Sequence, residues 1–131
     1  MAASLKSSDV FDLISKYLQS GDGENTVKKI QAVYQFDILE KKGGKVVKSY
    51  TIDMKNGKGE CKEGKPQKYD ALFTMTDADF VNVCTGKLNP QMAFVQGKMK
   101  IKGNMKKATA FTPDLFPSPN EENMKKYKAK F

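Results

Sequence analysis

The chain has 131 residues and a mass of 14.6 kDa, the size of a single domain, and its formal net charge is +8. The absence of histidine excludes histidine-based acid–base catalysis and histidine-ligated metals, and two cysteines do not make a structural zinc site on their own. No apolar run approaches the roughly 18 residues of a membrane span and no signal-peptide core follows Met1, so we expect an intracellular, reducing compartment in which Cys61 and Cys84 are thiols.

The basic charge is carried by lysine alone, because the sequence contains no arginine. Lysine attracts phosphates and anionic lipid surfaces, but it lacks the planar guanidinium that reads bases and phosphates through paired hydrogen bonds. The charge therefore favours diffuse attraction to polyanions or membranes over sequence-specific recognition of nucleic acid.

Two helices are expected first. Ser7 or Ser8 is a candidate N-cap with Asp9 in the first turn, and Gly21 ends the helix. A shorter helix is expected over 24–31, with Val27 and Ile30 on one side. The apolar residues that recur at helical spacing in the first helix are Val10, Phe11, Ile14, Tyr17 and Leu18.

After the second helix, the apolar residues recur at every second position, which predicts strands. A strand over 33–40, a glycine-containing loop over 41–45 and a return strand over 46–54 form a hairpin. Short strands are expected around 59–62 and over 69–75. The apolar faces of these strands carry Tyr34, Phe36, Ile38, Tyr50, Ile52, Met54, Phe73 and Met75.

Helical signals return at Thr76, which has the spacing of a capping box with Asp79 and is followed by Phe80 and Val83 on one face. A further short helix runs from Asn89 as N-cap to Gly97, with a proline at its first position and Met92, Ala93, Phe94 and Val95 inside it.

The last third of the chain begins with a short strand in which Met99 and Ile101 alternate with lysines 98, 100 and 102. A helix is expected over 105–111, a proline-containing loop over 112–120, and a weak, polar, mostly solvated helix over 121–130. Helices that precede and follow an antiparallel strand system along the chain predict an α+β domain, with one sheet and helices packed on one face.

No residue pattern indicates catalysis or a cofactor. Cys84 lies on an apolar helix face with no histidine to activate it, so a buried, inert thiol is expected. The seven methionines and eight phenylalanines give the chain an excess of soft apolar side chains. Composition leaves open whether they fill a soft core or line a pocket for flexible chains.

The segment from Asn89 to Met105, NPQMAFVQGKMKIKGNM, resembles the signature region of the sterol carrier protein 2 family of non-specific lipid-transfer proteins. The typical pattern runs here from Gly86-Lys87-Leu88 through Gly97-Lys98-Met99 to Gly103. Upstream blocks such as Ala32–Phe36, Asp53–Gly57 and Thr76–Phe80 resemble the family in order and spacing, so the resemblance covers about Val10 to Met105.

This resemblance implies a five-stranded, mostly antiparallel sheet covered on one face by about five helices, with an apolar tunnel between the layers. It implies a non-enzymatic carrier of fatty acids, fatty acyl-CoA, sterols or phospholipids that needs no cofactor. The ligand-lining positions, carried over from the family, are Val10, Ile14, Leu18, Val27, Ile30, Ile52, Met54, Phe73, Met75, Phe80, Val83, Phe94 and Ile101.

The C-terminal part departs from the family. The whole chain, 1–131, is expected to be one lipid-binding domain, in which 112–131 is a polar extension longer than in many relatives. The final Ala129-Lys130-Phe131 partly matches the peroxisomal address of many members and would be read by an import receptor, so a cytoplasmic or peroxisomal location is expected.

Three hypotheses compete. The first is an intracellular lipid-binding and transfer domain that makes transient contact with anionic membranes. The second is a non-catalytic interaction module whose interior is filled and whose lysine-rich surface docks on anionic membranes or acidic proteins. The third, a small basic nucleic-acid binder, is disfavoured because the aromatic residues follow core periodicities and are not interleaved with lysine on one face.

Overall fold

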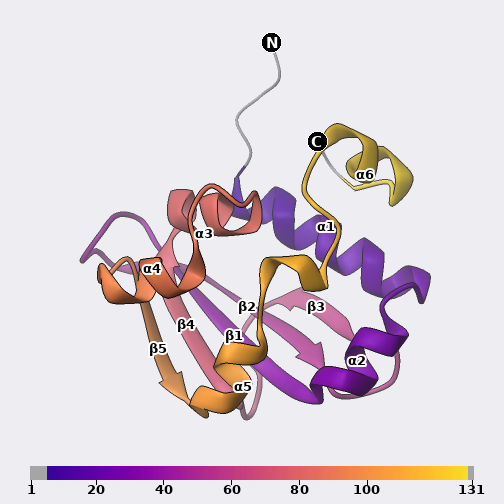
Figure 1. Ribbon diagram of the computed structural model, residues 1–131, viewed down its shortest axis with the longest axis horizontal. Helices are drawn as coiled ribbons and strands as arrows, with labels where there is room; N and C mark the ends of the chain where they lie inside the picture. Colours follow the sequence, from indigo (N-terminus) through magenta and orange to yellow (C-terminus); the bar gives the residue numbers. More distant parts are fainter. Residues whose placement is uncertain (1–5, 130–131) are drawn as a thin grey trace.

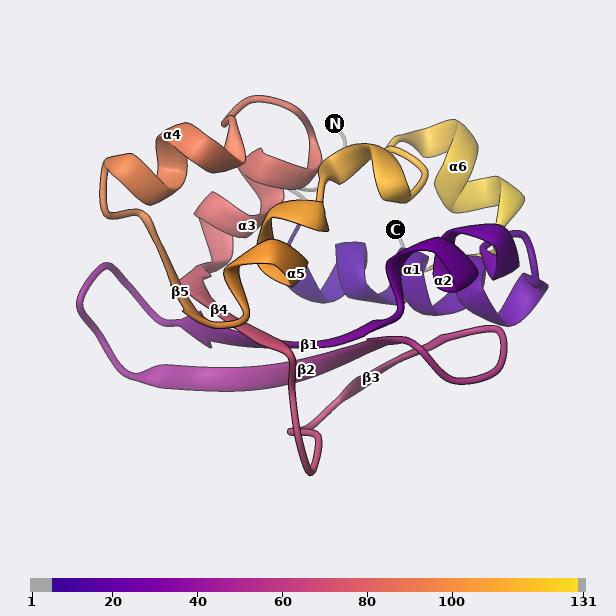
Figure 2. The same ribbon diagram turned by 60° about the horizontal axis from the view of Figure 1, so that its bottom comes forward.

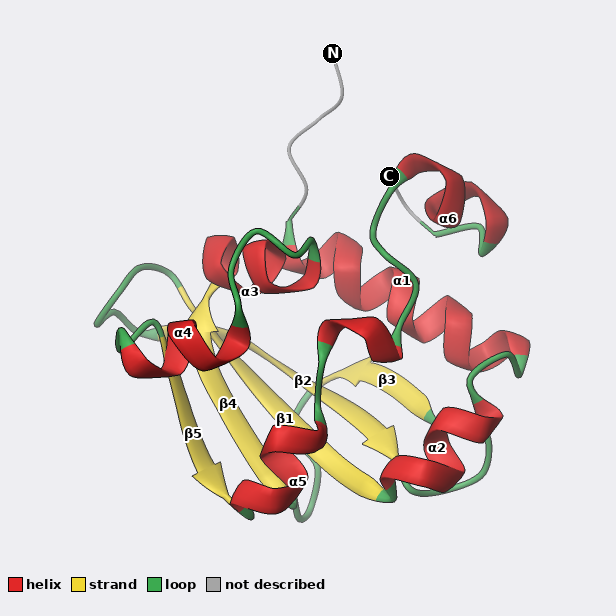
Figure 3. Cartoon of the chain, viewed as in Figure 1, coloured by secondary structure: helices red, strands yellow, loops and turns green. Residues whose placement is uncertain are grey.

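The computed structural model describes residues 6–129, except the side chain of Pro113. In that range one five-stranded sheet has the order β3-β2-β1-β4-β5, and all helices lie on one of its faces (Figures 1, 2 and 3). The strands are β1 Ala32–Leu39, β2 Val46–Met54, β3 Glu60–Glu63, β4 Ala71–Thr76 and β5 Met99–Gly103. The helices are α1 Ser7–Ser20, α2 Glu24–Ile30, α3 Asp77–Cys84, α4 Pro90–Val95, α5 Met105–Ala110, the 3-10 helix η1 Pro113–Leu115 and α6 Glu121–Lys126.

The sheet is mixed. β1 pairs antiparallel with β2 but parallel with β4, and β4 pairs antiparallel with β5. The parallel pair requires the chain to cross the sheet between β3 and β4, and residues 64–70 do so beneath the face opposite the helices (Figure 2). This crossing covers Thr51, whose hydroxyl donates a hydrogen bond of 2.8 Å to the carbonyl oxygen of Gly64. The predicted fold class is confirmed.

The N-cap of helix α1 lies one or two residues earlier than the sequence predicts. Lys6, not Ser7 or Ser8, occupies the N-cap position, and its backbone N–H donates to the Asp9 carboxylate at 2.9 Å. Ser7 donates through its backbone N–H and its hydroxyl to Asp77 of α3. The serine therefore ties two helices together instead of capping its own. Gly21 ends α1 with a φ of 89°, as predicted.

The C-terminal segment departs further from the predicted helix over 121–130. Helix α6 ends at Lys126, and it is not solvated on all sides, because Met124 is fully buried and the Tyr127 ring packs edge-on against Tyr17 of α1 at 5.4 Å between centroids. A six-residue helix is not stable alone in water, so its packing against α1 stabilises it. The predicted solvated helix is therefore wrong on this face.

No helix within residues 6–129 is long and apolar enough to cross a membrane.

The C-terminal tripeptide, for which a peroxisomal address is predicted, has Lys130 and Phe131 outside the described residues, so that address stays a prediction.

Candidate ligand-binding cavity

Helix α5 is held above the sheet by two long-range hydrogen bonds. The hydroxyl of Tyr34 on β1 donates to the carbonyl oxygen of Lys107 at 2.7 Å, and the Lys107 ammonium donates to the carbonyl oxygen of Ile30 at 3.1 Å. Burial, and to a lesser extent the nearby Asp70 carboxylate, raises the pKa of Tyr34 to about 12. The phenol therefore remains a hydrogen-bond donor across the ordinary pH range.

The turn from β5 into α5 depends on a glycine. Gly103 has a φ of 98°, and a Cβ atom there would lie 2.5 Å from the carbonyl oxygen of Asp70. That close approach lets the backbone N–H of Asn104 donate to the same oxygen at 2.7 Å. Asn104 then caps α5 by accepting from the N–H of Lys107 at 3.1 Å.

Helix α4 is placed by the cap that the sequence predicts. The Asn89 side-chain oxygen accepts from the backbone N–H of Gln91 at 2.8 Å, and Pro90 occupies the first helical position. After the helix, the backbone N–H of Lys98 donates to the carbonyl oxygen of Ala93 at 2.8 Å and returns the chain toward β5. Ala93 is fully buried, and its small side chain lets α4 sit close to the core.

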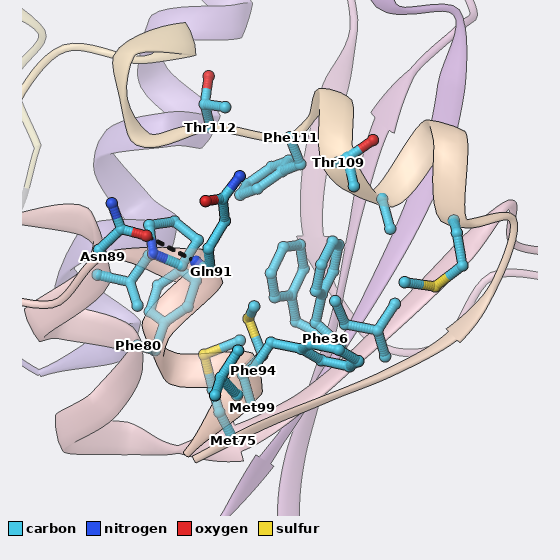
Figure 4. A pocket seen from close by; sticks show the side chains of 17 residues that line it. Phe36, Met75, Phe80, Asn89, Gln91, Phe94, Met99, Thr109, Phe111 and Thr112 are labelled. Carbon is cyan, nitrogen blue, oxygen red and sulfur yellow. Dashed lines mark hydrogen bonds between the residues drawn. The ribbon is translucent and has the colours of Figure 1, made fainter. Parts of the chain in front are cut away.

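A cavity of about 640 Å³ lies between the sheet and helices α3, α4 and α5 (Figure 4). Its wall is mostly aromatic, aliphatic and thioether, and no charged side chain from residues 6–129 contributes to it. The lining residues are Phe36, Phe73, Met75, Phe80, Val83, Asn89, Pro90, Gln91, Phe94, Val95, Met99, Ile101, Met105, Ala108, Thr109, Phe111 and Thr112.

The deep side of the cavity is a packed aromatic wall. Phe36 of β1 stacks on Phe73 of β4 with ring centroids 5.0 Å apart, and Phe111 lies 5.1 Å from Phe36. Phe80 of α3 stacks on Phe11 of α1 at 4.4 Å, so Phe80 belongs both to the core and to the cavity wall. This wall is rigid, because each ring is held by neighbours on more than one element.

The α4 side is open. Phe94 and Val95 line the cavity and are nevertheless 45% and 77% exposed, and Met105, which also lines it, is exposed as well. The polar groups that line the cavity are amides and hydroxyls, which Figure 4 shows at Asn89, Gln91, Thr109 and Thr112. The arrangement suits an apolar chain whose polar end stays near solvent.

Among the described residues, the lining of this cavity includes neither of the two cysteines and no carboxylate or lysine side chain. Burial raises the pKa of the Cys61 thiol far above its usual range and that of Cys84 to about 12, so both stay protonated and unreactive at neutral pH. Residues 6–129 contain no cluster of three or more cysteine or carboxylate side chains that would hold a metal ion.

The predicted ligand positions divide into two sets. Phe73, Met75, Phe80, Val83, Phe94 and Ile101 line the cavity together. The remaining seven are buried in the core between the sheet and helices α1 and α2 and do not line it: Val10, Ile14, Leu18, Val27, Ile30, Ile52 and Met54. Contact of any of these residues with a ligand stays a prediction.

Sequence reasoning missed part of the wall. Phe36 and Met99 carry the alternation that marks an inward strand face, but alternation does not separate cavity wall from filled core. Asn89 and Pro90 match the start of a helix completely, so no sequence pattern indicated that they also line the cavity. Thr109, Phe111 and Thr112 lie where a helix ends in a loop, and no local signal placed them at the cavity.

The chain matches the family model described as the SCP-2 sterol transfer family over residues 11–115. It is 46% identical over 119 residues to sterol carrier protein 2 of Arabidopsis thaliana, covering 89% of this chain and 95% of that protein. The human protein of the same name is 45% identical over 100 residues, and the match spans only 18% of its length.

Two solved structures are similar in fold and sequence. Sterol carrier protein 2 from Yarrowia lipolytica in its apo form has a TM-score of 0.70 and 34% identity, covering 86% of this chain and 91% of that chain. Sterol carrier protein 2 from Aedes aegypti in complex with palmitate has a TM-score of 0.67 and 34% identity, covering 86% and 96%.

Proposed function

The chain belongs to the SCP-2 sterol transfer family, and on this premise we propose that it is a non-enzymatic carrier that holds one long-chain lipid in the cavity beneath α4 and α5. The observation that carries the proposal is the cavity itself. An interaction module whose interior is filled by side chains, the alternative that composition left open, has no need of an apolar space of about 640 Å³.

The size of the cavity suits a long acyl chain. A methylene group occupies a volume similar to one molecule's share of liquid water, about 30 Å³, so the cavity holds on the order of twenty carbon atoms. Burying each methylene contributes about 0.8 kcal/mol, from which the cost of ordering the chain is subtracted. Affinity should therefore rise with acyl length until the cavity is full.

The wall supports a flexible ligand over one of fixed shape. Met75, Met99 and Met105 have unbranched, polarizable side chains that adapt to a bent chain. The palmitate bound by the Aedes aegypti relative is a ligand of this class. A free fatty acid or the acyl part of a fatty acyl-CoA is thus the first candidate, and a sterol or a phospholipid is the second.

Native mass spectrometry and displacement of a fluorescent fatty acid test the proposal. We expect co-purified or added fatty acid to appear as a bound mass, with affinity that increases from short to long acyl chains. A clean apo mass with no uptake of added lipid, or an affinity independent of chain length, would overturn the carrier role.

A pair of matched variants locates the site. Phe94→Asn removes a half-exposed aromatic side chain from the cavity wall, whereas Val47→Asn changes an exposed apolar side chain outside it. We expect weaker fatty-acid binding in the first variant only, and an unchanged melting temperature in both. Equal affinities would place the ligand elsewhere.

A further inference from the structure

The exposed apolar side chains gather at one end of the sheet. In the register, Ile38 of β1, Met75 of β4 and Met99 of β5 lie in one row, so the β1–β2 hairpin and the end of α4 meet at the same end (Figures 1 and 2). Of the seven large hydrophobic side chains that are exposed within residues 6–129, five belong to this end: Val46, Val47, Met92, Phe94 and Val95. Such a concentration on a soluble domain marks an interaction surface.

The same end is strongly basic. The hairpin contributes Lys41, Lys42 and Lys45 against the single acid Glu40, and Lys98 follows α4. All four lysines are exposed, and no ion pair found among residues 6–129 includes them. From Phe80 to Pro113 the sequence contains six lysines and no acid. Charge and apolar surface together suit a partner that is anionic outside and apolar beneath.

We propose that this end, formed by the hairpin residues 40–47 and helix α4 with Lys98, docks on the surface of an anionic lipid bilayer and brings the mouth of the cavity against it. The proposal rests on the lipid-carrier function proposed above. Phe94 and Val95 belong both to the exposed patch and to the cavity wall, so the docked mouth faces the acyl layer. A chain that moves between cavity and bilayer there avoids exposing its methylenes to water.

Single-tryptophan variants test the orientation, because the chain contains no tryptophan of its own. Met92→Trp places the probe on α4 at a residue that is 49% exposed and does not line the cavity. Tyr69→Trp is the matched control, at a residue 39% exposed in the crossing on the opposite face of the sheet. The probes are phosphatidylcholine vesicles with and without phosphatidylserine, carrying lipids brominated on the acyl chain.

We expect the emission of Met92→Trp to shift to shorter wavelength and to be quenched by the brominated chains in phosphatidylserine vesicles, while Tyr69→Trp stays unchanged. Equal quenching of both probes, or none at Met92→Trp, would overturn the proposal. Binding of the surface to a soluble acidic polypeptide without quenching by vesicles would also overturn it, in favour of a protein partner.

Charge variants give an independent measurement. Lys42→Gln with Lys45→Gln removes two charges from the docking end, and Lys28→Gln with Lys29→Gln removes two exposed charges from α2 at the far end of the molecule. We expect partition to phosphatidylserine vesicles to weaken about 25-fold in the first pair, or about fivefold per lysine, and far less in the second. If both pairs weaken partition equally, the effect depends only on net charge, and the proposal that this end docks on the bilayer is overturned.

Displacement of a fluorescent fatty acid in the absence of vesicles separates the two proposals. If all of these variants and the unaltered protein bind the fatty acid equally, a failure of vesicle quenching refutes the docking end alone. If the unaltered protein binds no fatty acid, the carrier function fails, whatever the vesicle measurements show.

Discussion

Partial filling of the cavity should move the preferred acyl length. Ala108 of α5 is buried and lines the cavity, and Ala108→Phe adds six carbon atoms to the wall. A cavity of about 150 Å³ holds a whole benzene molecule, so the added ring removes at most roughly 150 Å³ from a cavity of about 640 Å³. Capacity should therefore fall from on the order of twenty carbon atoms to about sixteen.

The loss of affinity in this variant should depend on the length of the acyl chain. A chain that filled the original cavity leaves up to about five methylenes unplaced, which costs up to about 4 kcal/mol before the gain in chain entropy is subtracted. A chain of twelve carbons is shorter than the reduced capacity of about sixteen, so it still fits and should keep its affinity within about twofold. In the Ala108→Phe variant, affinity should therefore stop rising at an acyl length between twelve carbons and the length that fills the original cavity. Over the same range, the affinity of the unaltered protein should continue to rise.

The assay is displacement of a fluorescent fatty acid by saturated acids of increasing length, with the melting temperature measured in parallel. Ala110→Phe is the matched control, because Ala110 lies on the same helix, is half-buried and does not line the cavity. An equal loss at all chain lengths, or the same profile in both variants, would refute the assignment of this cavity as the ligand site.

Three further outcomes follow from particular contacts. Phe80→Ala should lower the free energy of unfolding by about 3–5 kcal/mol in urea denaturation, because Phe80 is 1% exposed and stacked on Phe11; a loss below about 1 kcal/mol would show that its role is confined to the cavity. Transfer of lipid to anionic vesicles should slow sharply with added salt while transfer to neutral vesicles barely changes; equal salt responses would leave the lysines as solubility residues. The pKa of Tyr34 is raised from 10.0 to about 12, so the unfolded chain ionises first and the free energy of unfolding should fall as pH rises from about 10 to 12; Tyr34→Phe should remove this part of the pH dependence.

Much of the secondary structure could be predicted because its signals act over a few residues. The cap at Asn89, the oxygen of Thr76 that accepts from the N–H of Asp79, and the left-handed Gly21 each begin or end a helix where the sequence indicates. The alternation in β2 predicts its bounds from Val46 to Met54. Ser7 shows the limit of such reasoning, because its hydroxyl binds Asp77, which lies 70 residues further along the chain.

The pairing of strands and the filling of the core depend on residues that lie far apart in the sequence. The parallel pairing of β1 with β4 joins strands that are separated by the hairpin and the crossing, and no local pattern distinguishes it from an antiparallel arrangement. The burial of Met124 is of the same kind, since it depends on α6 meeting α1 from the other end of the sequence.

The sequence by itself determined the period of each element, its ends and the apolar face that it buries, because these follow from backbone geometry and from hydrogen bonds between near neighbours. It did not separate Ile52, which lies in filled core, from Phe73, which lines the cavity, because both are inward apolar residues on strands. Only the tertiary structure decided that difference. Tyr34 and Lys107 hold α5, and the Asn89 cap orients α4, at positions where the side chains of the two layers do not meet. Cavity volume is what remains after all of these elements have packed, so no single segment encodes it.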